Sequence, residues 1–365
     1  MARAAVLHRV GADKVELLDD VTTIDPGPEQ VKVRIRATGV CQSDLSTMSG
    51  VLPSMPLPSV LGHEGAGIVA AVGAHVTEVA VGDHVVVNWT PSCGRCGECL
   101  RGHPHLCIAL LIEAYGSPGF LLGDGTPAFG MSGVGTWAEE TVVPRQAVVK
   151  VPDDVPLEYA AMFGCAVATG VGAAINTAKV RPGAKVAVVG SGGVGLAVIA
   201  GAKISGASVI LAVDPNPAKH AAALTFGATH TAGPDDVEAT AGLLTGGQGF
   251  DYVFEAVGKS AAIDTAWKLT ARGGDLVIAG AGSADDRWSI DALALLMDAK
   301  TIRPAVYGSC DLRRDVPVFV DLWRSGLLDL EPMITSRIAF ADLNDAIANL
   351  RSGDALRQVV LFDGK

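Results

Sequence analysis

The sequence of 365 residues is poor in aromatic side chains and in charge, and acidic residues outnumber basic ones. Aromatic residues make up 5% of the chain and charged residues 18%, while hydrophobic residues reach 49%. With 28 Lys and Arg against 39 Asp and Glu, the formal net charge is −11. No nucleic-acid partner is expected, because neutralising phosphates takes clustered Lys and Arg. The high apolar fraction excludes a largely disordered chain and predicts sizeable cores.

Long uninterrupted hydrophobic runs are also missing. The longest apolar stretch, residues 186–202, is interrupted by several glycines. It falls short of the roughly 20 apolar residues that a membrane helix needs. The first ten residues, MARAAVLHRV, lack the apolar core of a signal peptide. We therefore expect a soluble cytoplasmic protein that has no membrane partner.

Cysteine is unevenly distributed, with seven in the chain and four of them inside residues 93–107. In a reducing compartment, crowded cysteines indicate metal ligands before disulfides. Four thiolates at short spacing can close a tetrahedral shell around a structural zinc ion. An iron–sulfur cluster is the other metal candidate, although its common bacterial run has three residues before the last cysteine. Here seven residues precede the last of Cys93, Cys96, Cys99 and Cys107.

The chain changes character twice, which predicts two domains of α/β class overall. Residues 1–166 contain short strand-like runs between Gly and Pro turns, as in a barrel-like β-rich domain. Residues 167–306 alternate strands and helices, as in a doubly wound parallel sheet. Residues 307–365 contain two helical stretches and a strand-like end, and we expect them to return to the first domain. The strands expected in the second domain are residues 185–189, 208–213, 251–255, 275–279 and 301–306, with a weaker one near residue 229.

A glycine-rich turn follows the expected strand 185–189 and opens a helix. The pattern is typical of dinucleotide binding, because glycines permit the tight turn, the close approach of pyrophosphate and the packing of helix on strand. Asp214, about 20 positions further on, can accept hydrogen bonds from ribose hydroxyls and would repel a 2′-phosphate, so it predicts NAD. The turn consists of Gly190, Ser191, Gly192, Gly193, Val194 and Gly195.

A second metal site is indicated by Cys41, His63 and Cys165. Two thiolates and an imidazole can hold zinc and leave a fourth position for water or substrate, which is the arrangement of a catalytic site. Taken singly, Cys41 and Cys165 could be small buried apolar residues and His63 an ordinary loop histidine. Their joint presence in a chain that also has a cysteine cluster and a dinucleotide-binding pattern favours the metal-site interpretation.

The sequence resembles the zinc-dependent medium-chain alcohol dehydrogenases over nearly its whole length. The most specific match is Gly62-His63-Glu64-Gly65-Ala66-Gly67, and the four-cysteine segment and the glycine turn fit as well. The resemblance implies a GroES-like catalytic domain, a Rossmann domain, NAD and two zinc ions per subunit. It also implies a homodimer or homotetramer that acts on a small alcohol or aldehyde.

The same resemblance suggests roles for individual residues. Cys41, His63 and Cys165 look like the ligands of the catalytic zinc, and Glu64 looks like the acid that can approach the metal. Asp44 looks like the carboxylate that orients His63, and Ser43 like the hydroxyl that takes the alcohol proton. Further matches are Lys219 at the adenosine ribose, Arg357 at the pyrophosphate, Thr169 and Val194 at the nicotinamide, and Trp89 in the substrate pocket.

Two positions depart from the family. Gln42 stands where many members carry a basic residue for the pyrophosphate, and Ser46 stands where many carry a histidine that relays the proton. The expected function is reversible hydride transfer between a primary or secondary alcohol and NAD.

Two alternatives to this function stay open. Asn88 to Cys107 and Gly172 to Asn176 look similar to actinobacterial formaldehyde dehydrogenases that use the thiol mycothiol. A protein of another class, which binds zinc and nucleotide without catalysis, is the second alternative.

Overall fold

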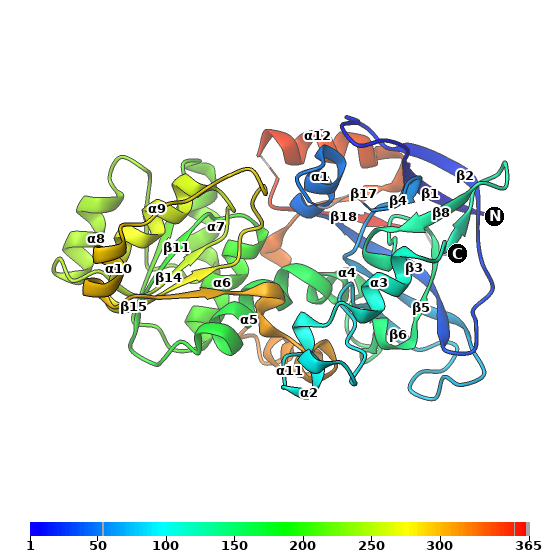
Figure 1. Cartoon of the computed structure of the whole chain (residues 1–365), viewed down its shortest axis with the longest axis horizontal. Helices are drawn as coiled ribbons and strands as arrows, with labels where there is room; N and C mark the ends of the chain where they lie inside the picture. The colour runs from blue at the N-terminus through cyan, green and yellow to red at the C-terminus, as the bar shows by residue number, and fades with distance from the viewer. Residues whose placement is uncertain (53–54, 354, 363–365) are drawn as a thin grey trace. The chain divides into compact units, whose positions relative to one another are not determined.

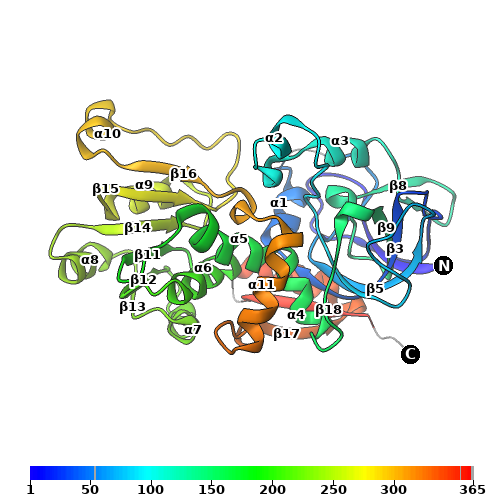
Figure 2. The ribbon, with the colours of Figure 1, turned by 90° about the horizontal axis from the view of Figure 1, so that it is seen from below.

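The computed structural model describes residues 1–52, 55–353 and 355–362. Its chain divides into two compact units (Figures 1 and 2). The first unit comprises Met1–Cys165, Asp311–Asp321 and Ile334–Lys365, and the second comprises Ala166–Cys310 and Leu322–Met333. The tail thus differs in part from the expected return segment. Residues 322–333 group with the second unit, because the 3-10 turn Glu331–Met333 packs against helix α7 (Ala218–Phe226).

The strands of the first unit form a barrel and a separate sheet. The closed barrel has the order β1-β2-β7-β8-β4, and the sheet has the order β10-β6-β5-β3-β18-β17, with β9 also paired to β3. The strands are β1 (Ala2–Leu7), β2 (Glu16–Thr23), β3 (Gln30–Val40), β4 (Ser59–Val60), β5 (Gly65–Val72), β6 (His84–Val87), β7 (Phe120–Leu121), β8 (Pro127–Gly130), β9 (Glu140–Pro144), β10 (Val148–Lys150), β17 (Ile334–Ala339) and β18 (Arg357–Leu361). The helices are α1 (Gln42–Ser49), α2 (Gly97–Leu100), α3 (Ala109–Tyr115), α4 (Leu157–Met162), α11 (Leu312–Arg324) and α12 (Leu343–Ser352).

Strand β3 shows why this sheet forms. Val31, Val33 and Ile35 are buried and alternate with more exposed residues, as the two-residue period of a half-buried strand requires. From Ala37 to Val40 the strand is buried continuously, and there it pairs with β18 from the far end of the chain. This pairing brings the predicted site residues Cys41 and Arg357 onto neighbouring strand ends.

The second unit contains the predicted parallel sheet. Its strand order is β13-β12-β11-β14-β15-β16, and each neighbouring pair is parallel. The strands are β11 (Lys185–Val189), β12 (Val209–Val213), β13 (His230–Ala232), β14 (Phe250–Glu255), β15 (Thr270–Ile278) and β16 (Thr301–Pro304). The helices are α5 (Ala168–Gly172), α6 (Gly193–Ile204), α7, α8 (Val237–Thr245), α9 (Ser260–Leu269) and α10 (Ala292–Asp298).

Central strand β11 is buried after its first residue, as expected for a parallel sheet covered on both faces. Helices α6 and α9 both pack against β11 and β14. The predicted fold class is therefore confirmed. Strand β15 begins at Thr270 rather than Asp275, because the Gly273–Gly274 turn lies at an irregularity inside the strand instead of before it.

One helical stretch, Leu157–Ala178, is long and apolar enough to cross a membrane by composition alone, and 83% of its apolar window is buried inside the protein. A largely buried helix is typical of a protein core, where a continuous apolar surface packs against other elements. The stretch is not a uniform α-helix, since π-helical turns at Phe163–Val167 and Ala173–Ala178 flank α5. Such wider turns frequently occur at functional positions, and the first one carries Cys165.

Candidate functional site

A buried cluster in the first unit brings together residues that are far apart in the sequence. The side-chain ligand atoms of Cys41, His63, Glu64 and Cys165 all lie within 4.8 Å of one another. Cys41 precedes helix α1, His63 and Glu64 precede strand β5, and Cys165 lies in the π-helical turn. The three ligands predicted for a catalytic metal are thus assembled, with Glu64 beside them.

Asp44 fixes the orientation of His63. One carboxylate oxygen, Oδ1, lies 3.1 Å from His63 Nδ1 and accepts the Gly62 N–H at 3.2 Å, while Oδ2 accepts the Cys41 N–H at 2.9 Å. A carboxylate only accepts, so Nδ1 donates its proton to Asp44, and Nε2 is the nitrogen left to bind a metal once its own proton is lost. Nε2 is buried and has no hydrogen-bond partner among the described residues. A buried, unpaired imidazole nitrogen between two thiols is what a zinc ion would satisfy.

The charges of the cluster are strongly coupled. A hydrogen bond from the Cys165 thiol lowers the pKa of Cys41 well below its usual value, although burial opposes the shift. The same bond and burial raise the pKa of Cys165. Burial opposes protonation of His63, but the Asp44 carboxylate raises its pKa well above the usual value. Cys41 and Cys165 thus share a hydrogen-bonded proton, which a metal that binds both sulfurs as thiolates would displace.

Glu64 pairs with Arg357 inside the same cluster. Arg357 Nη1 lies 2.9 Å from Glu64 Oε2 and donates a hydrogen bond to the Val40 carbonyl at 3.3 Å. Burial raises the pKa of Glu64 to about 8 even though the guanidinium opposes this. Arg357 is 3% exposed, and in this structure its guanidinium is occupied by Glu64 and the Val40 carbonyl. Its predicted contact with pyrophosphate stays a prediction.

The sequence did not reveal two residues that support the cluster. A Cβ on Gly39 would collide with Glu64 Oε2, so the glycine leaves room for that carboxylate. Trp137 is fully buried, its indole N–H donates to the Gly39 carbonyl at 3.0 Å, and its backbone N–H donates to Leu61 at 2.8 Å. The sequence around Trp137 gave no signal that it supports the cluster, because its contacts are about 75 to 98 positions away.

Trp89 and Ser43 lie near the cluster, Trp89 through a ring contact with His63 and Ser43 through its position close to Cys41 in the sequence. The Trp89 ring meets the His63 ring edge to face, with centroids 6.1 Å apart, and it also packs against the core of the first unit. Ser43 lies in the first turn of α1, two residues after Cys41, and its side chain is partly exposed. Their predicted roles in substrate binding and proton transfer remain predictions.

The four-cysteine segment forms a second cluster, with ligand atoms within 4.8 Å of one another. The Cys96 Sγ lies 3.5 Å from Cys99 Sγ and 3.8 Å from Cys107 Sγ. Backbone N–H groups, led by that of Arg95, lower the pKa of Cys93 to about 6. Four thiols converging around one point fit a closed zinc shell.

The glycine turn lies in the second unit between β11 and α6, as predicted. A Cβ on Gly195 would collide with the Gly190 carbonyl, whereas a Cβ on Gly192 would meet nothing within 4 Å. Gly195 therefore permits helix and strand to touch, and Gly192 leaves its backbone open to an approaching phosphate. The turn leads directly into the N-terminus of α6 from Gly193, where backbone N–H groups favour anions.

Asp214 follows β12 and faces this turn. Its carboxylate accepts the N–H of Ser191 at 2.8 Å and that of Asn216 at 2.9 Å, and Lys219 Nζ lies 3.9 Å away. Asp214 and Lys219 are thus brought together at the turn. On the other side, a Cβ on Gly170 would lie 2.5 Å from the Val194 carbonyl, so the helix turn that carries Thr169 packs on the start of α6.

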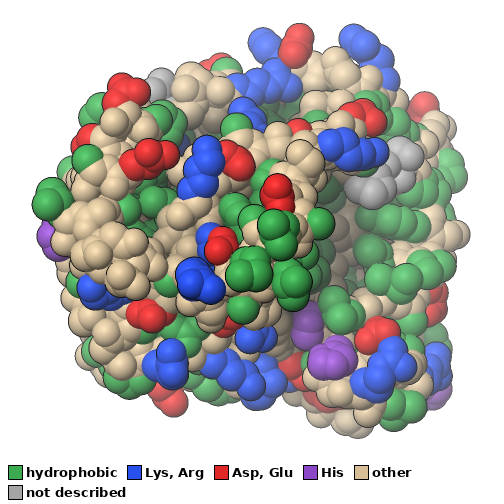
Figure 3. Space-filling model, turned by 60° about the vertical axis from the view of Figure 1, so that its left-hand side comes forward, with side chains coloured by type: hydrophobic (Ala, Val, Ile, Leu, Met, Phe, Trp, Pro, Cys, Tyr) green, Lys and Arg blue, Asp and Glu red, His purple; other side chains and the backbone are tan. Residues whose placement is uncertain are grey.

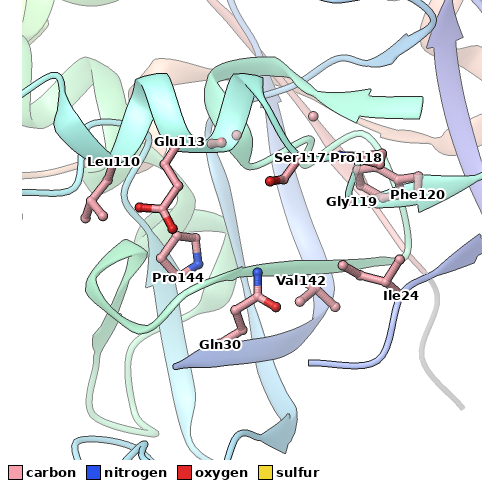
Figure 4. A pocket seen from close by; sticks show the side chains of 13 residues that line it. Ile24, Gln30, Leu110, Glu113, Ser117, Pro118, Gly119, Phe120, Val142 and Pro144 are labelled. Atoms are coloured by element: carbon pink, nitrogen blue, oxygen red, sulfur yellow. The ribbon is translucent and has the colours of Figure 1, made fainter. Parts of the chain in front are cut away.

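A small pocket elsewhere in the first unit takes no part in this arrangement. Figure 4 shows it beside α3, with the polar side chains of Gln30, Glu113 and Ser117 around it. Its volume is about 80 Å³. Among the described residues, the predicted site residues do not line it.

The two thiol clusters and the dinucleotide turn define a class, that of dehydrogenases which combine zinc with a nicotinamide cofactor. Comparison with known families agrees. The alcohol dehydrogenase GroES-like domain matches residues 27–153, and the zinc-binding dehydrogenase family matches residues 193–325. The chain belongs to the zinc-dependent medium-chain alcohol dehydrogenases, and it is an oxidoreductase. The predicted family, fold and cofactor classes are thereby confirmed.

Similar proteins cover the whole chain. The S-(hydroxymethyl)glutathione dehydrogenase of Paracoccus denitrificans is 37% identical over 99% of both chains. An alcohol dehydrogenase zinc-binding domain protein from Burkholderia ambifaria has a similar structure, with a TM-score of 0.93 at 32% identity over 100% of this chain and 99% of the other. Benzyl alcohol dehydrogenase from Acinetobacter calcoaceticus gives 0.91 at 32% identity over 99% of both.

Proposed function

We propose that the chain oxidises a small primary or secondary alcohol with NAD, and reduces the corresponding aldehyde or ketone in reverse. The observation that carries this proposal is the placement of His63, which Asp44 holds beside the thiols of Cys41 and Cys165 and whose Nε2 has no hydrogen-bond partner in the described part of the chain. These three side chains would hold zinc and leave one position for substrate. When bound, zinc supplies a Lewis acid for the alcohol oxygen and NAD accepts the hydride.

The remaining residues of the first unit would bind and move protons. Ser43 takes the proton of the alcohol, because its hydroxyl lies on the first turn after Cys41. Asp44 keeps His63 in one orientation and tautomer, as carboxylates next to metal-binding histidines do. Glu64, paired with Arg357 in this structure, would be the acid that can approach the metal during ligand exchange. Trp89 narrows the substrate pocket from the side of His63.

The second unit would bind NAD rather than NADP. The Asp214 carboxylate would accept hydrogen bonds from the ribose hydroxyls and repel a 2′-phosphate. Lys219, on α7, would also contact the adenosine ribose. Gly190 to Gly195 and the start of α6 would hold the pyrophosphate, and Thr169 and Val194 would contact the nicotinamide. The proposed contact of Arg357 with the pyrophosphate would require this side chain to leave Glu64.

A thiol-dependent formaldehyde dehydrogenase is the second candidate. It is favoured by the relative from Paracoccus denitrificans, whose name denotes a glutathione adduct as its substrate. The adduct is itself an alcohol, so the same zinc and NAD chemistry would serve. For this chain the thiol would be mycothiol or another low-molecular-mass thiol.

We further propose a homodimer or homotetramer in the cytoplasm. Edge strand β16 is exposed along its length, and next to it α10 exposes Leu293, Leu296 and Met297. On the face drawn in Figure 3, groups of hydrophobic side chains lie among charged ones. Exposed apolar groups of this kind mark association surfaces. We also propose domain boundaries after residues 166 and 306, which lie one and four residues from the divisions between the compact units at 165 and 310.

The test is formation of NADH, followed by absorbance, over a panel of alcohols and with formaldehyde, each with and without mycothiol or glutathione. Turnover of simple alcohols without thiol supports the first candidate. Turnover restricted to formaldehyde plus thiol supports the second. No NADH from any combination, in protein that contains zinc, would contradict both.

A further inference from the structure

Glu255 is a buried acid that no sequence motif singled out and that has no role in the proposed mechanism. It is the last residue of β14, has no exposed surface, and is paired with Val189 at the end of β11. Its place is the carboxyl edge of the parallel sheet, directly beside the glycine turn. Ligands of doubly wound sheets bind at this edge, where the strand order reverses.

The side chain and the backbone of Glu255 hold two different loops. Its Oε1 accepts the N–H groups of Val257 and Gly258, each at 2.7 Å. Its own carbonyl accepts the N–H groups of Ala279 and Gly280 at 2.8 and 3.0 Å. One residue therefore joins the loop after β14 to the loop after β15.

These loops touch so closely that the acid has little freedom. A Cβ on Gly258 would lie 2.5 Å from the Ala281 carbonyl carbon, and one on Gly280 would lie 2.7 Å from Glu255 Oε2. Burial raises the pKa of Glu255, and the surrounding backbone N–H groups oppose that rise. A buried carboxylate is costly unless it is hydrogen-bonded. Here Oε1 accepts two N–H groups from the loop after β14, while Oε2 is buried without a hydrogen-bond partner among the described residues.

The loop after β14 forms one wall of the glycine turn. A Cβ on Gly190 would lie 2.6 Å from Val257 Cγ2 and 3.3 Å from the Ala256 carbonyl carbon. The Ala256 N–H also donates to the Val189 carbonyl at 2.9 Å. A movement of Val257 would therefore change the packing around Gly190, where the pyrophosphate is expected.

We propose that Glu255 is a positioning residue for the dinucleotide, which sets the loops 256–258 and 279–282 against the glycine turn through its hydrogen bonds. It touches no cofactor and acts through Val257 and Gly190. The inference rests on the proposed NAD site, because it concerns the shape of that site. If this inference is correct, replacing Glu255 should weaken cofactor binding more than it lowers the stability of the sheet.

The test compares Glu255→Gln with Asp251→Asn in the full-length, zinc-loaded protein. Asp251 is a matched control on the same strand, since its Oδ2 accepts the Lys185 N–H at 2.8 Å near the opposite end of β14. The amide of Glu255→Gln keeps the size but loses the charged acceptor. Its Kd for NADH, measured by fluorescence titration, should rise about tenfold, a change that corresponds to ~1.4 kcal/mol. Asp251→Asn should stay within about twofold of wild type, because its loss is remote from the ligand edge.

Steady-state kinetics supply a second readout. In Glu255→Gln the KM for NAD should rise while kcat at saturating NAD and the zinc content remain close to wild type. A purely structural role would instead lower Tm and active fraction in both variants without a selective change in the NAD constants. An unchanged NADH Kd in a folded Glu255→Gln protein would overturn the inference.

The remaining outcomes are also decisive. If wild type itself binds no NADH, the proposed function fails rather than the role of Glu255. If Glu255→Gln does not fold, Glu255→Asp replaces it, since this variant keeps the charge but withdraws the acceptor by one methylene. Weakened NADH binding by Glu255→Asp supports the inference, and wild-type affinity, or failure of this variant to fold as well, overturns it.

Discussion

The two thiol clusters of the first unit differ in burial, in composition and in spacing along the chain. Cys93, Cys96 and Cys99 are partly exposed, and all four residues of their cluster come from one short segment. Cys41, His63, Glu64 and Cys165 are buried and come from three separate places in the chain. The first cluster can therefore form by local folding, while the second exists only after the sheet and the helix that carries Cys165 have assembled.

The difference also concerns the groups that surround each cluster. Asp44 and Arg357 hold His63 and Glu64 by charge-assisted contacts at 3.1 and 2.9 Å. The four-cysteine cluster relies mainly on thiols and backbone N–H groups, such as the Cys96 N–H on Cys93 Sγ at 3.3 Å. A site that must exchange ligands needs neighbours that control charge, and a site that only holds a loop together does not. Loss of the two clusters should have different consequences.

The largest effect is expected for Cys41→Ser. It should remove about one zinc ion per chain and leave less than about 1% of wild-type activity, since even one positioned catalytic group contributes about 10²-fold or more. The fold should persist because the four-cysteine cluster is untouched. Metal analysis and circular dichroism check this expectation. Cys310→Ser is the control, because Cys310 lies outside both clusters and should keep full zinc content.

Cys99→Ser should act on stability before it acts on chemistry. Opening the four-thiol shell should lower the free energy of unfolding by about 4 kcal/mol, at the upper end for single substitutions, because metal binding there contributes to folding. Protein that remains folded should still bind the other zinc ion. Thermal unfolding with and without added zinc measures the change. Equal Tm values for wild type and variant would mean that the clusters do not differ as described.

Ser43→Ala tests whether the open cluster carries the proton chemistry. Alcohol oxidation should fall roughly 10²-fold, the usual scale for a positioned proton-transfer group, with both zinc ions retained. Ser46→Ala, on the same helix, should change the rate little. The measurement is kcat with a deuterated alcohol, so that hydride transfer is known to limit the rate. Wild-type kcat in Ser43→Ala under those conditions would remove Ser43 from the mechanism.

The smallest effect is expected away from both clusters, for Asp214→Asn. The amide keeps one acceptor for the Ser191 N–H but removes the charge that opposes a 2′-phosphate. The preference of kcat/KM for NAD over NADP should narrow by roughly tenfold, about what one charged hydrogen bond contributes. Initial rates with both cofactors decide the matter. A wild-type protein that uses NADP as well as NAD would refute the premise.

Local patterns in the sequence predicted the parts of the molecule that depend on neighbouring residues. The strand at residues 185–189 and the glycine turn after it agree with the structure, and so does the convergence of Cys93 to Cys107. Cys165 could be grouped with Cys41 and His63 by residue type, but no spacing pattern supported this group because its partners lie more than 100 positions away, and the family resemblance strengthened it. The ion pair between Glu64 and Arg357 was not predicted, since it depends on β18 pairing with β3.

Glu255 shows a different limit of the sequence. An acid at the end of an apolar strand is usually taken as solvent-exposed. In the structure, Glu255 is instead fully buried between two loops. The same holds for Arg357, whose positive charge gave no hint of its burial. Burial of charged groups is decided by segments distant in the chain, so it escapes patterns of spacing and composition.

The glycine beside Glu64 has a consequence for the evolution of this cluster. Position 39 has no room for a side chain while a glutamate stands at position 64, and its carbonyl is held by the indole of Trp137. In a close-packed interior a change at one such position must be matched by its neighbours. Across a large set of homologous sequences, positions 39, 64 and 137 should therefore vary together, and a member that lacks the glutamate should be the one that tolerates a larger residue at position 39.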